Sequence, residues 1–261
     1  MFIWSYMHAI VKSAAPSAHA DSPACVPAMM PAGEQFLRNH LVIPMLAALA
    51  ASALLMGLQG DFLIADLIYA AQDHAWLLRD SWITTTVVHE AGKTLASAAC
   101  LVVLLAWVWS LFDRRLAHLR RPLGYLAVTT LLGCAAVSLL KAITAMDCPW
   151  DLQRYGGLRP FVGLFEARPG DLGRAACFPA GHASAGYAWV TLYFFFAAVR
   201  PQLKWVGLAV ALVVGATFGV SQQLRGAHFM SHDLWTLVTC WLVALAGSYW
   251  LITPRATGGR A

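Results

Sequence analysis

The chain alternates long hydrophobic runs with short polar segments. Each run has about 17 or more residues, which is the length at which an apolar helix can span a bilayer. The runs contain no Asp, Glu, Lys or Arg except Lys204 at the edge of the fifth. They cover about 41–59, 94–112, 122–140, 183–199, 203–220 and 234–252. Because a backbone in lipid must satisfy its own hydrogen bonds, the pattern predicts an all-α, polytopic membrane bundle of six transmembrane helices.

The polar segments suggest how the rest of the chain is organised. Residues 1–40 hold four prolines and no clear period, so we expect a disordered N-terminal segment. Residues 41–252 form the expected membrane domain, and residues 253–261 form a cytoplasmic tail. Within residues 60–93, acidic and apolar residues alternate and two tryptophans follow, which favours a segment lying at the membrane interface.

Composition supports a membrane protein. The chain is 59% hydrophobic and 12% charged, whereas soluble domains carry about 25% charged residues. A large soluble helical protein is the alternative, but six such runs are too many for one core to cover. The net charge of +5 does not indicate nucleic-acid binding, because the basic residues are scattered through loops instead of lining one face.

The distribution of arginines predicts the orientation in the membrane. The loop 113–121 holds four arginines, and basic short loops stay in the cytoplasm. Alternation then leaves both termini cytoplasmic and puts the loops 60–93, 141–182 and 221–233 outside. The expected location is the inner membrane of a bacterium, with the external loops in the periplasm.

Three chemically useful side chains fall on this external side. Lys141 ends the third run, His182 begins the fourth, and His228 lies between the fifth and sixth. Phosphoryl transfer needs positive charge and N–H donors around the phosphoryl oxygens, a nucleophile, and an acid for the leaving oxygen. Lysine supplies charge and the histidines can be acid and nucleophile. Gly181 allows close backbone approach, and the first N–H groups of the fourth helix are expected to point at an anion.

The same segments carry a family resemblance. Lys141-x6-Cys148-Pro149, Pro179-Ala180-Gly181-His182 and Ser221-x4-Gly226-x-His228 resemble the K-x6-RP, PSGH and SR-x5-H-x3-D signatures of type 2 phosphatidic acid phosphatases. That family shares its site with bacterial acid phosphatases and vanadium haloperoxidases. The resemblance implies a metal-independent mechanism without a cofactor. His228 would attack phosphorus to form a phosphohistidine, His182 would protonate the leaving alkoxide, and Lys141 and Gly181 would hold the phosphoryl oxygens together with arginines.

The chain departs from the family pattern at four positions. The departures are Cys148 for Arg, Ala180 for Ser, Gln222 for Arg and His232 for Asp. The candidate replacements for the missing arginines are Arg225, Arg154 and Arg159. His232, four residues after His228, is the expected partner of the nucleophile, with Asp233 behind it. An inactive relative is the alternative explanation of the same departures.

Two cysteines, Cys148 and Cys177, lie in the loop between the third and fourth runs. They can pair if this loop faces an oxidising compartment, and the sequence leaves that choice open. His89-Glu90 resembles the start of a zinc-protease motif, but Lys93 stands where the second histidine should be, so a structural role for His89 is favoured.

The sequence therefore predicts a lipid phosphatase within the bilayer, with no nucleic-acid partner and no obligatory protein partner. Its candidate substrates are undecaprenyl pyrophosphate, lipid A phosphates and phosphatidylglycerol phosphate. A phosphotransferase of the same family remains open. A zinc-dependent hydrolase using His182, His228 and His232 with Asp233 also remains open. A transporter is disfavoured, because the polar clusters lie at the ends of the runs and not at the midplane.

Overall fold

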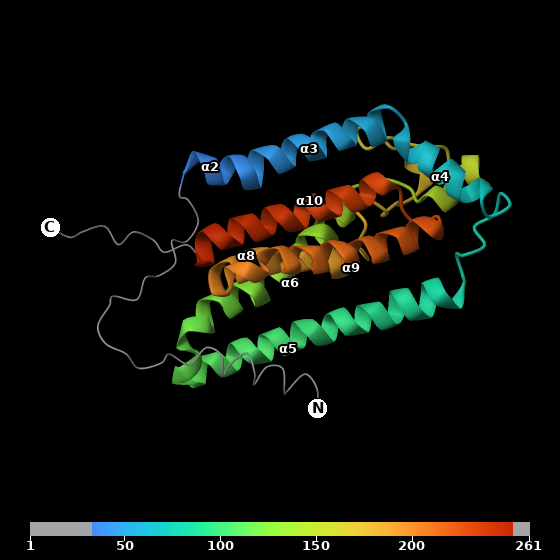
Figure 1. Cartoon of the computed structure of the whole chain (residues 1–261). Coiled ribbons are helices and arrows are strands. Elements are labelled where there is room, and N and C mark those ends of the chain that lie inside the picture. The colour runs from blue at the N-terminus through green and yellow to red at the C-terminus, as the bar shows by residue number, and fades with distance from the viewer. Residues whose placement is uncertain (1–32, 253–261) are drawn as a thin grey trace. The chain divides into compact units, whose positions relative to one another are not determined.

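The long apolar runs form helices throughout the part of the chain that the computed structural model describes, residues 33–252. The chain divides into Met1–Pro31, which lies outside the described residues, and Ala32–Ala261, which holds every helix below (Figure 1). The α-helices are α2 (Glu34–Leu37), α3 (Ile43–Ser52), α4 (Gly60–Ala70), α5 (Gly92–Phe112), α6 (Arg120–Ile143), α7 (Ser184–Tyr187), α8 (Thr191–Val199), α9 (Lys204–Leu224) and α10 (Met230–Gly247).

Short 3₁₀ and π-helical segments extend several of these helices into longer rods. Five rods in the described part are long and apolar enough to cross a membrane: Glu34–Gly57, Ile83–Phe112, Arg114–Ile143, Pro201–Leu224 and Met230–Ile252. The fourth expected span is a shorter apolar helix, Ser184–Val199. The predicted helical membrane bundle is therefore confirmed, with one span shorter than the others.

Two predicted boundaries differ from the structure. The first rod begins at Glu34 and not near residue 41, so the end of the segment expected to be disordered is helical. The interfacial segment is also shorter than residues 60–93, because the helix of the second span already begins at Ile83. A run of β-branched and apolar residues after Trp82 continues that helix outward. The predicted tail at 253–261 and residues 1–32 lie outside the described residues.

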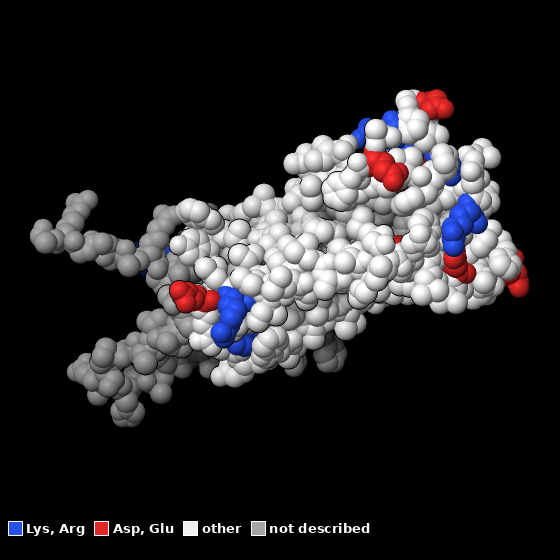
Figure 2. All heavy atoms as spheres, turned by 90° about the horizontal axis from the view of Figure 1, so that it is seen from above, with Lys and Arg blue, Asp and Glu red and all other residues white. Residues whose placement is uncertain are grey.

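The helices are not equally buried. In the rods that contain α6 and α10, 33% and 39% of the most apolar window is inside the protein, against 6% for those that contain α3 and α5. α6 packs on both α10 and α5, while α9 packs on α7 and α8 (Figure 1). Large aliphatic side chains on the outer helices, such as Leu46 and Leu95, are more than half exposed. Such surfaces suit lipid, and Figure 2 shows charged residues at the two ends with an uncharged stretch between them.

Small residues let α7 and α9 touch. A side chain on Gly186 would collide with the backbone of Gly215, and one on Gly215 would collide with the ring of Tyr187. Close backbone contact of this kind is a common way for helices to associate in membranes. It fixes the start of the Ser184–Val199 helix, and therefore the turn just before it, against the bundle.

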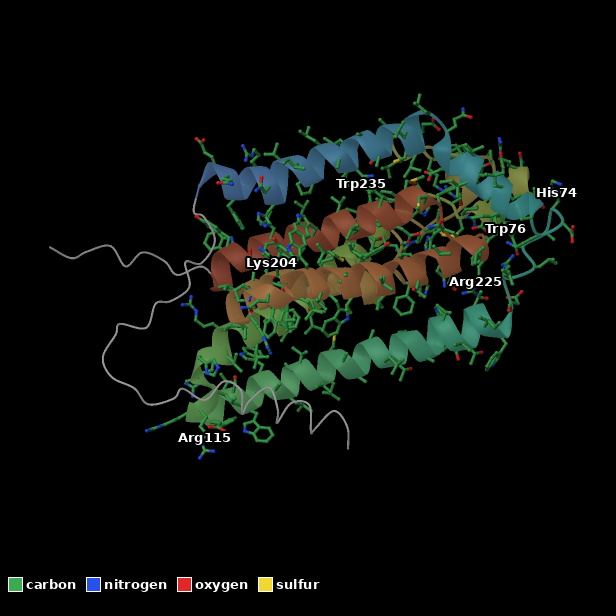
Figure 3. The ribbon with its side chains drawn as sticks, in the orientation of Figure 1. His74, Trp76, Arg115, Lys204, Arg225 and Trp235 are labelled. Atoms are coloured by element: carbon green, nitrogen blue, oxygen red, sulfur yellow. A yellow bond between two sulfur atoms is a disulfide. The ribbon has the colours of Figure 1, made fainter. Side chains whose placement is uncertain are left out.

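The two ends of the bundle carry different chemistry. Arg115 and Lys204 lie at one end, while His74, Trp76 and Arg225 lie at the other (Figure 3). The second end also carries α4 and the long loop between α6 and α7 (Figure 1). It is at this end that the polar motif segments meet.

Candidate active site

Main-chain hydrogen bonds join the three motif segments to one another. The N–H of Cys177 donates to the carbonyl of Met146 at 3.1 Å, linking the segment after α6 to the segment before α7. The N–H of Ala180 donates to the carbonyl of His232 at 3.1 Å, and the N–H of Trp150 donates to the carbonyl of Gly226 at 2.9 Å. Each pair of segments is thus tied directly, so the side chains they carry are held in one place.

Lys141 and Gly181 form the positively charged wall of the site. Lys141 lies in the last turn of α6, and its Nζ is 3.5 Å from the position that a β-carbon on Gly181 would occupy. The first N–H groups of the fourth helix were predicted to point at an anion, but the turn before α7 does not leave them free. The N–H of Ser184 donates to the carbonyl of Gly181, and that of Ala185 donates to the carbonyl of His182, because the chain forms a tight turn before α7.

His182 and His228 approach each other from different segments. Their ring centroids are 6.3 Å apart. His228 lies in the turn before α10, where Gly226 takes a left-handed backbone conformation with φ +72°. Its Nδ1 is 3.3 Å from Nδ1 of His232, and the main-chain carbonyl of Cys177 interacts with both rings. The contact predicted between His228 and His232 is present, although the turn and not a continuous helix makes it.

The surroundings of His182 and His228 favour the neutral form of both rings. Burial, followed by the charges of His89 and Lys141, lowers the pKa of His182 to about 4. Burial and the neighbouring His232 and Lys141 hold the pKa of His228 well below its ordinary value. A neutral imidazole has a free lone pair, so His228 is ready to act as a nucleophile at neutral pH.

Asp233 points away from this pair. Its Oδ2 accepts a hydrogen bond of 2.5 Å from the side-chain amide of Gln223, and its carboxylate packs against Gly219 of α9. It lies one position beyond His232 on α10, which turns it toward α9 and not toward His228. The side chain nearest to the nucleophile is therefore His232.

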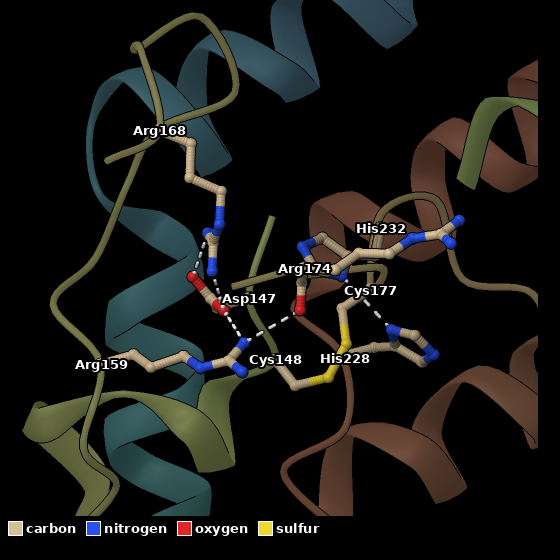
Figure 4. The surroundings of a disulfide bond; sticks show 8 residues. All are labelled: Asp147, Cys148, Arg159, Arg168, Arg174, Cys177, His228 and His232. Atoms are coloured by element: carbon tan, nitrogen blue, oxygen red, sulfur yellow. Dashed lines mark hydrogen bonds and ion pairs between the residues drawn. A yellow bond between two sulfur atoms is a disulfide. The ribbon is translucent and has the colours of Figure 1, made fainter. Parts of the chain in front are cut away.

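A disulfide joins Cys148 to Cys177 across a sequence separation of 29 residues (Figure 4). It occupies the position at which the family pattern has an arginine. Beside it, the buried Asp147 accepts hydrogen bonds of 2.6 Å from Nη1 of Arg159 and 2.6 Å from Nη1 of Arg168. Burial raises the pKa of Asp147, but the two guanidinium groups outweigh burial and hold this pKa below its ordinary value.

The candidate arginines differ in their positions. Arg154 forms a two-point ion pair with Asp66, and Arg159 is held by Asp147, so neither lines the cavity described below. A carboxylate therefore pairs with each of them, Asp66 from α4 with Arg154 and Asp147 from the same loop with Arg159. Arg225 does not line the cavity either, but its Nη1 donates to Oε1 of Gln222, which does, at 3.3 Å.

A cavity of about 600 Å³ opens beside these residues, between α5, α6, α7 and α9. Its polar lining includes Lys141, Gly181, His182 and Gln222, and its apolar lining includes Leu131 and Phe218. Along α6 it reaches from Lys141 to Thr130, which is about 16 Å at the rise of an α-helix. One end of the cavity is thus chemically suited to a phosphate and the remainder to a hydrocarbon chain.

Two basic residues that line the cavity were not among the predicted site residues. His89 and Lys93 line the cavity from the second span, and Nε2 of His89 is 2.5 Å from Nε2 of His182. The available signal was their spacing of four residues, which puts both on one helical face, on the same side of the membrane as His182. His89, for which the sequence favours a structural role, therefore contacts a predicted site residue directly.

The side chains do not form a metal-ligand set. Within residues 33–252, no group of three or more His, Cys, Asp or Glu is arranged to hold a metal ion. His182 contacts His89, His228 contacts His232, and Asp233 turns to Gln223.

The described residues form a helical membrane bundle with an amphipathic cavity that Lys141 and His182 line, and His228 lies buried close to His182. The model of the PAP2 superfamily matches residues 122–255, which is just over half of the chain. The chain belongs to this superfamily, as the sequence resemblance predicted. Its members are generally phosphatases, so membership indicates activity on phosphate esters. Neither the curated proteins nor the solved structures contain a match.

Proposed function

We propose that the protein is an integral-membrane lipid phosphatase that works through a phosphohistidine at His228. The observation that carries the proposal is the amphipathic cavity, in which Lys141 and His182 lie at the polar end of a passage between apolar helices. A lipid phosphate has the matching shape, with a charged headgroup on a hydrocarbon chain. The substrate class is a phosphomonoester or pyrophosphate of a membrane lipid.

The proposed chemistry uses only side chains of this chain. Nε2 of His228 forms a bond to phosphorus while the bond from phosphorus to the leaving oxygen breaks. His182 passes to that oxygen a proton that the bound phosphate monoanion supplies, and Lys141 offsets the charge on the phosphoryl oxygens. Water then attacks phosphorus, and the bond from phosphorus to Nε2 of His228 breaks. The proton that water loses passes through His182 to the departing inorganic phosphate.

The proposed location is a bacterial inner membrane with the site on the periplasmic side. Two observations support it. The disulfide of Cys148 suits an oxidising compartment, and the arginine-rich loop represented by Arg115 lies at the opposite end from Arg225 (Figure 3).

The proposal is tested by phosphate release from purified protein in detergent. The panel comprises phosphatidic acid, phosphatidylglycerol phosphate, a lipid A preparation and undecaprenyl pyrophosphate, each with and without EDTA. We expect release from at least one lipid, no loss with EDTA, and none from His228→Gln. Release that EDTA abolishes and zinc restores would replace the proposal with metal-dependent hydrolysis.

A further inference from the structure

The contact between His89 and His182 involves a residue, His89, that lies outside the three motif segments. His89 lies on the helix that leads into α5, before the region matched by the superfamily model, and 93 residues from His182 in sequence. Two ring nitrogens at 2.5 Å require a single proton between them, because one nitrogen must donate and the other accept. The contact therefore restricts the protonation pattern of both rings.

This contact leaves only one nitrogen of His182 for chemistry. Nε2 is occupied by His89, whereas Nδ1 is buried and has no hydrogen-bond partner. A buried polar atom without a partner is costly in a folded protein and calls for an explanation. An oxygen of a bound substrate would supply the missing partner.

We propose that His89 is the positioning residue of the general acid, a role that rests on the proposed phosphatase function. Nε2 of His89 accepts a hydrogen bond from the Nε2–H of His182. That bond fixes the ring and its tautomer, so that His182 presents Nδ1 to the leaving oxygen. The bound phosphate monoanion gives its proton to Nδ1, and Nδ1 passes this proton to the leaving oxygen while Nε2 keeps its own. Nδ1 then takes a proton from the attacking water and returns it to the departing phosphate. The number of protons on the enzyme is the same after each turnover.

Charged groups from three elements surround the pair. Those that act on it are Glu90 and Lys93 from the same helix, Lys141 from α6, and Arg225 from the turn after α9. An acceptor held in place orients a catalytic imidazole in the same way as the carboxylate of a hydrolase triad.

The first test reads the tautomer directly and does not depend on activity. Full-length protein with ¹⁵N-labelled histidine in detergent micelles is studied by NMR correlation of ring nitrogens and protons, with His182→Gln to assign the His182 signals. We expect neutral His182 in the Nε2–H form near pH 7.5, and a mixed or Nδ1–H form in His89→Leu. The Nδ1–H form in the wild type, or an unchanged tautomer in His89→Leu, would overturn the proposal.

The second test separates positioning from a purely structural role by the leaving group. Dioctanoyl phosphatidic acid releases an alkoxide that needs a proton, whereas farnesyl diphosphate releases a phosphate monoester that needs none. We expect His89→Leu to lower kcat at least about tenfold on the former, out of the roughly 10²–10⁴-fold that a general acid supplies. On the latter the loss should stay below about threefold, with little change in KM on either.

Conservative replacement and a matched control complete the design. The amide oxygen of His89→Gln can accept the same hydrogen bond, so this variant should recover most of the activity on phosphatidic acid. His118→Gln, an exposed histidine on the arginine-rich loop, should behave as the wild type. Equal losses on both substrates would contradict positioning. A wild type that releases phosphate from no lipid would refute the phosphatase function alone, and the tautomer measurement would still decide the contact.

Discussion

Breaking the disulfide between Cys148 and Cys177 should destabilise the protein by a calculable amount. The cross-link closes a loop with a sequence separation of 29 residues. In the chain-entropy model such a closure is worth about 3.6 kcal/mol of unfolding free energy at 25 °C. For a protein of this size, 1 kcal/mol shifts the melting temperature by roughly 2–4 °C, so the double variant Cys148→Ser/Cys177→Ser should melt about 7–14 °C lower.

The assay is thermal unfolding of purified protein in detergent, followed by intrinsic tryptophan fluorescence. Cys100→Ser is the matched control, because Cys100 is a free, partly buried cysteine. Dithiothreitol should lower the melting temperature of the wild type and leave that of the double variant unchanged. A double variant that melts within about 2 °C of the control would refute the reasoning. Phosphate release should also fall, because the carbonyl of Cys177, which contacts both His228 and His232, would no longer be held.

Three further predictions concern the surroundings of the site. Asp147→Asn should lower the free energy of unfolding by about 2–3 kcal/mol. This loss is smaller than that for breaking a fully buried ion pair, because the Arg159 side chain is 33% exposed. A melting temperature equal to that of the wild type would contradict this prediction. Arg225→Ala should reduce phosphate release far more than Gln222→Ala in parallel assays, and equal mild losses would exclude the arginine as the replacement. Since the pKa of His182 falls from 6.5 to about 4 on folding, the unfolded chain binds more protons below pH 6.5. The melting temperature should therefore fall as the pH drops from 7 toward 4, and less steeply in His182→Gln; a melting temperature that rises over this range would contradict it.

Much of the site could be predicted from sequence because its members lie at the ends of apolar runs. Run length indicates a span, and alternation of spans puts Lys141, His182 and His228 on one side of the membrane. The spacing of His228 and His232 also indicated their contact. These are properties that hydrophobic pattern and motif spacing record directly.

The rest depends on side-chain pairings that no local pattern records. Arg154 pairs with Asp66, 88 residues away, and Arg159 pairs with Asp147, 12 residues away in the same loop, so carboxylates occupy two candidate phosphate ligands. His89 reaches His182 only because the helix of the second span begins at Ile83, earlier than the uncharged run suggests. Sequence can list the cations, but the fold decides which of them remain available to a substrate.

The central claim is tested most directly by trapping the covalent intermediate. Purified protein is mixed with a ³²P-labelled lipid phosphate that it hydrolyses, quenched with base within milliseconds, and digested for mapping of the label. We expect an alkali-stable, acid-labile phosphate on His228, formed and lost at rates consistent with turnover, and absent from His228→Gln. Steady release of phosphate without label on His228, or with undiminished turnover in His228→Gln, would contradict the account.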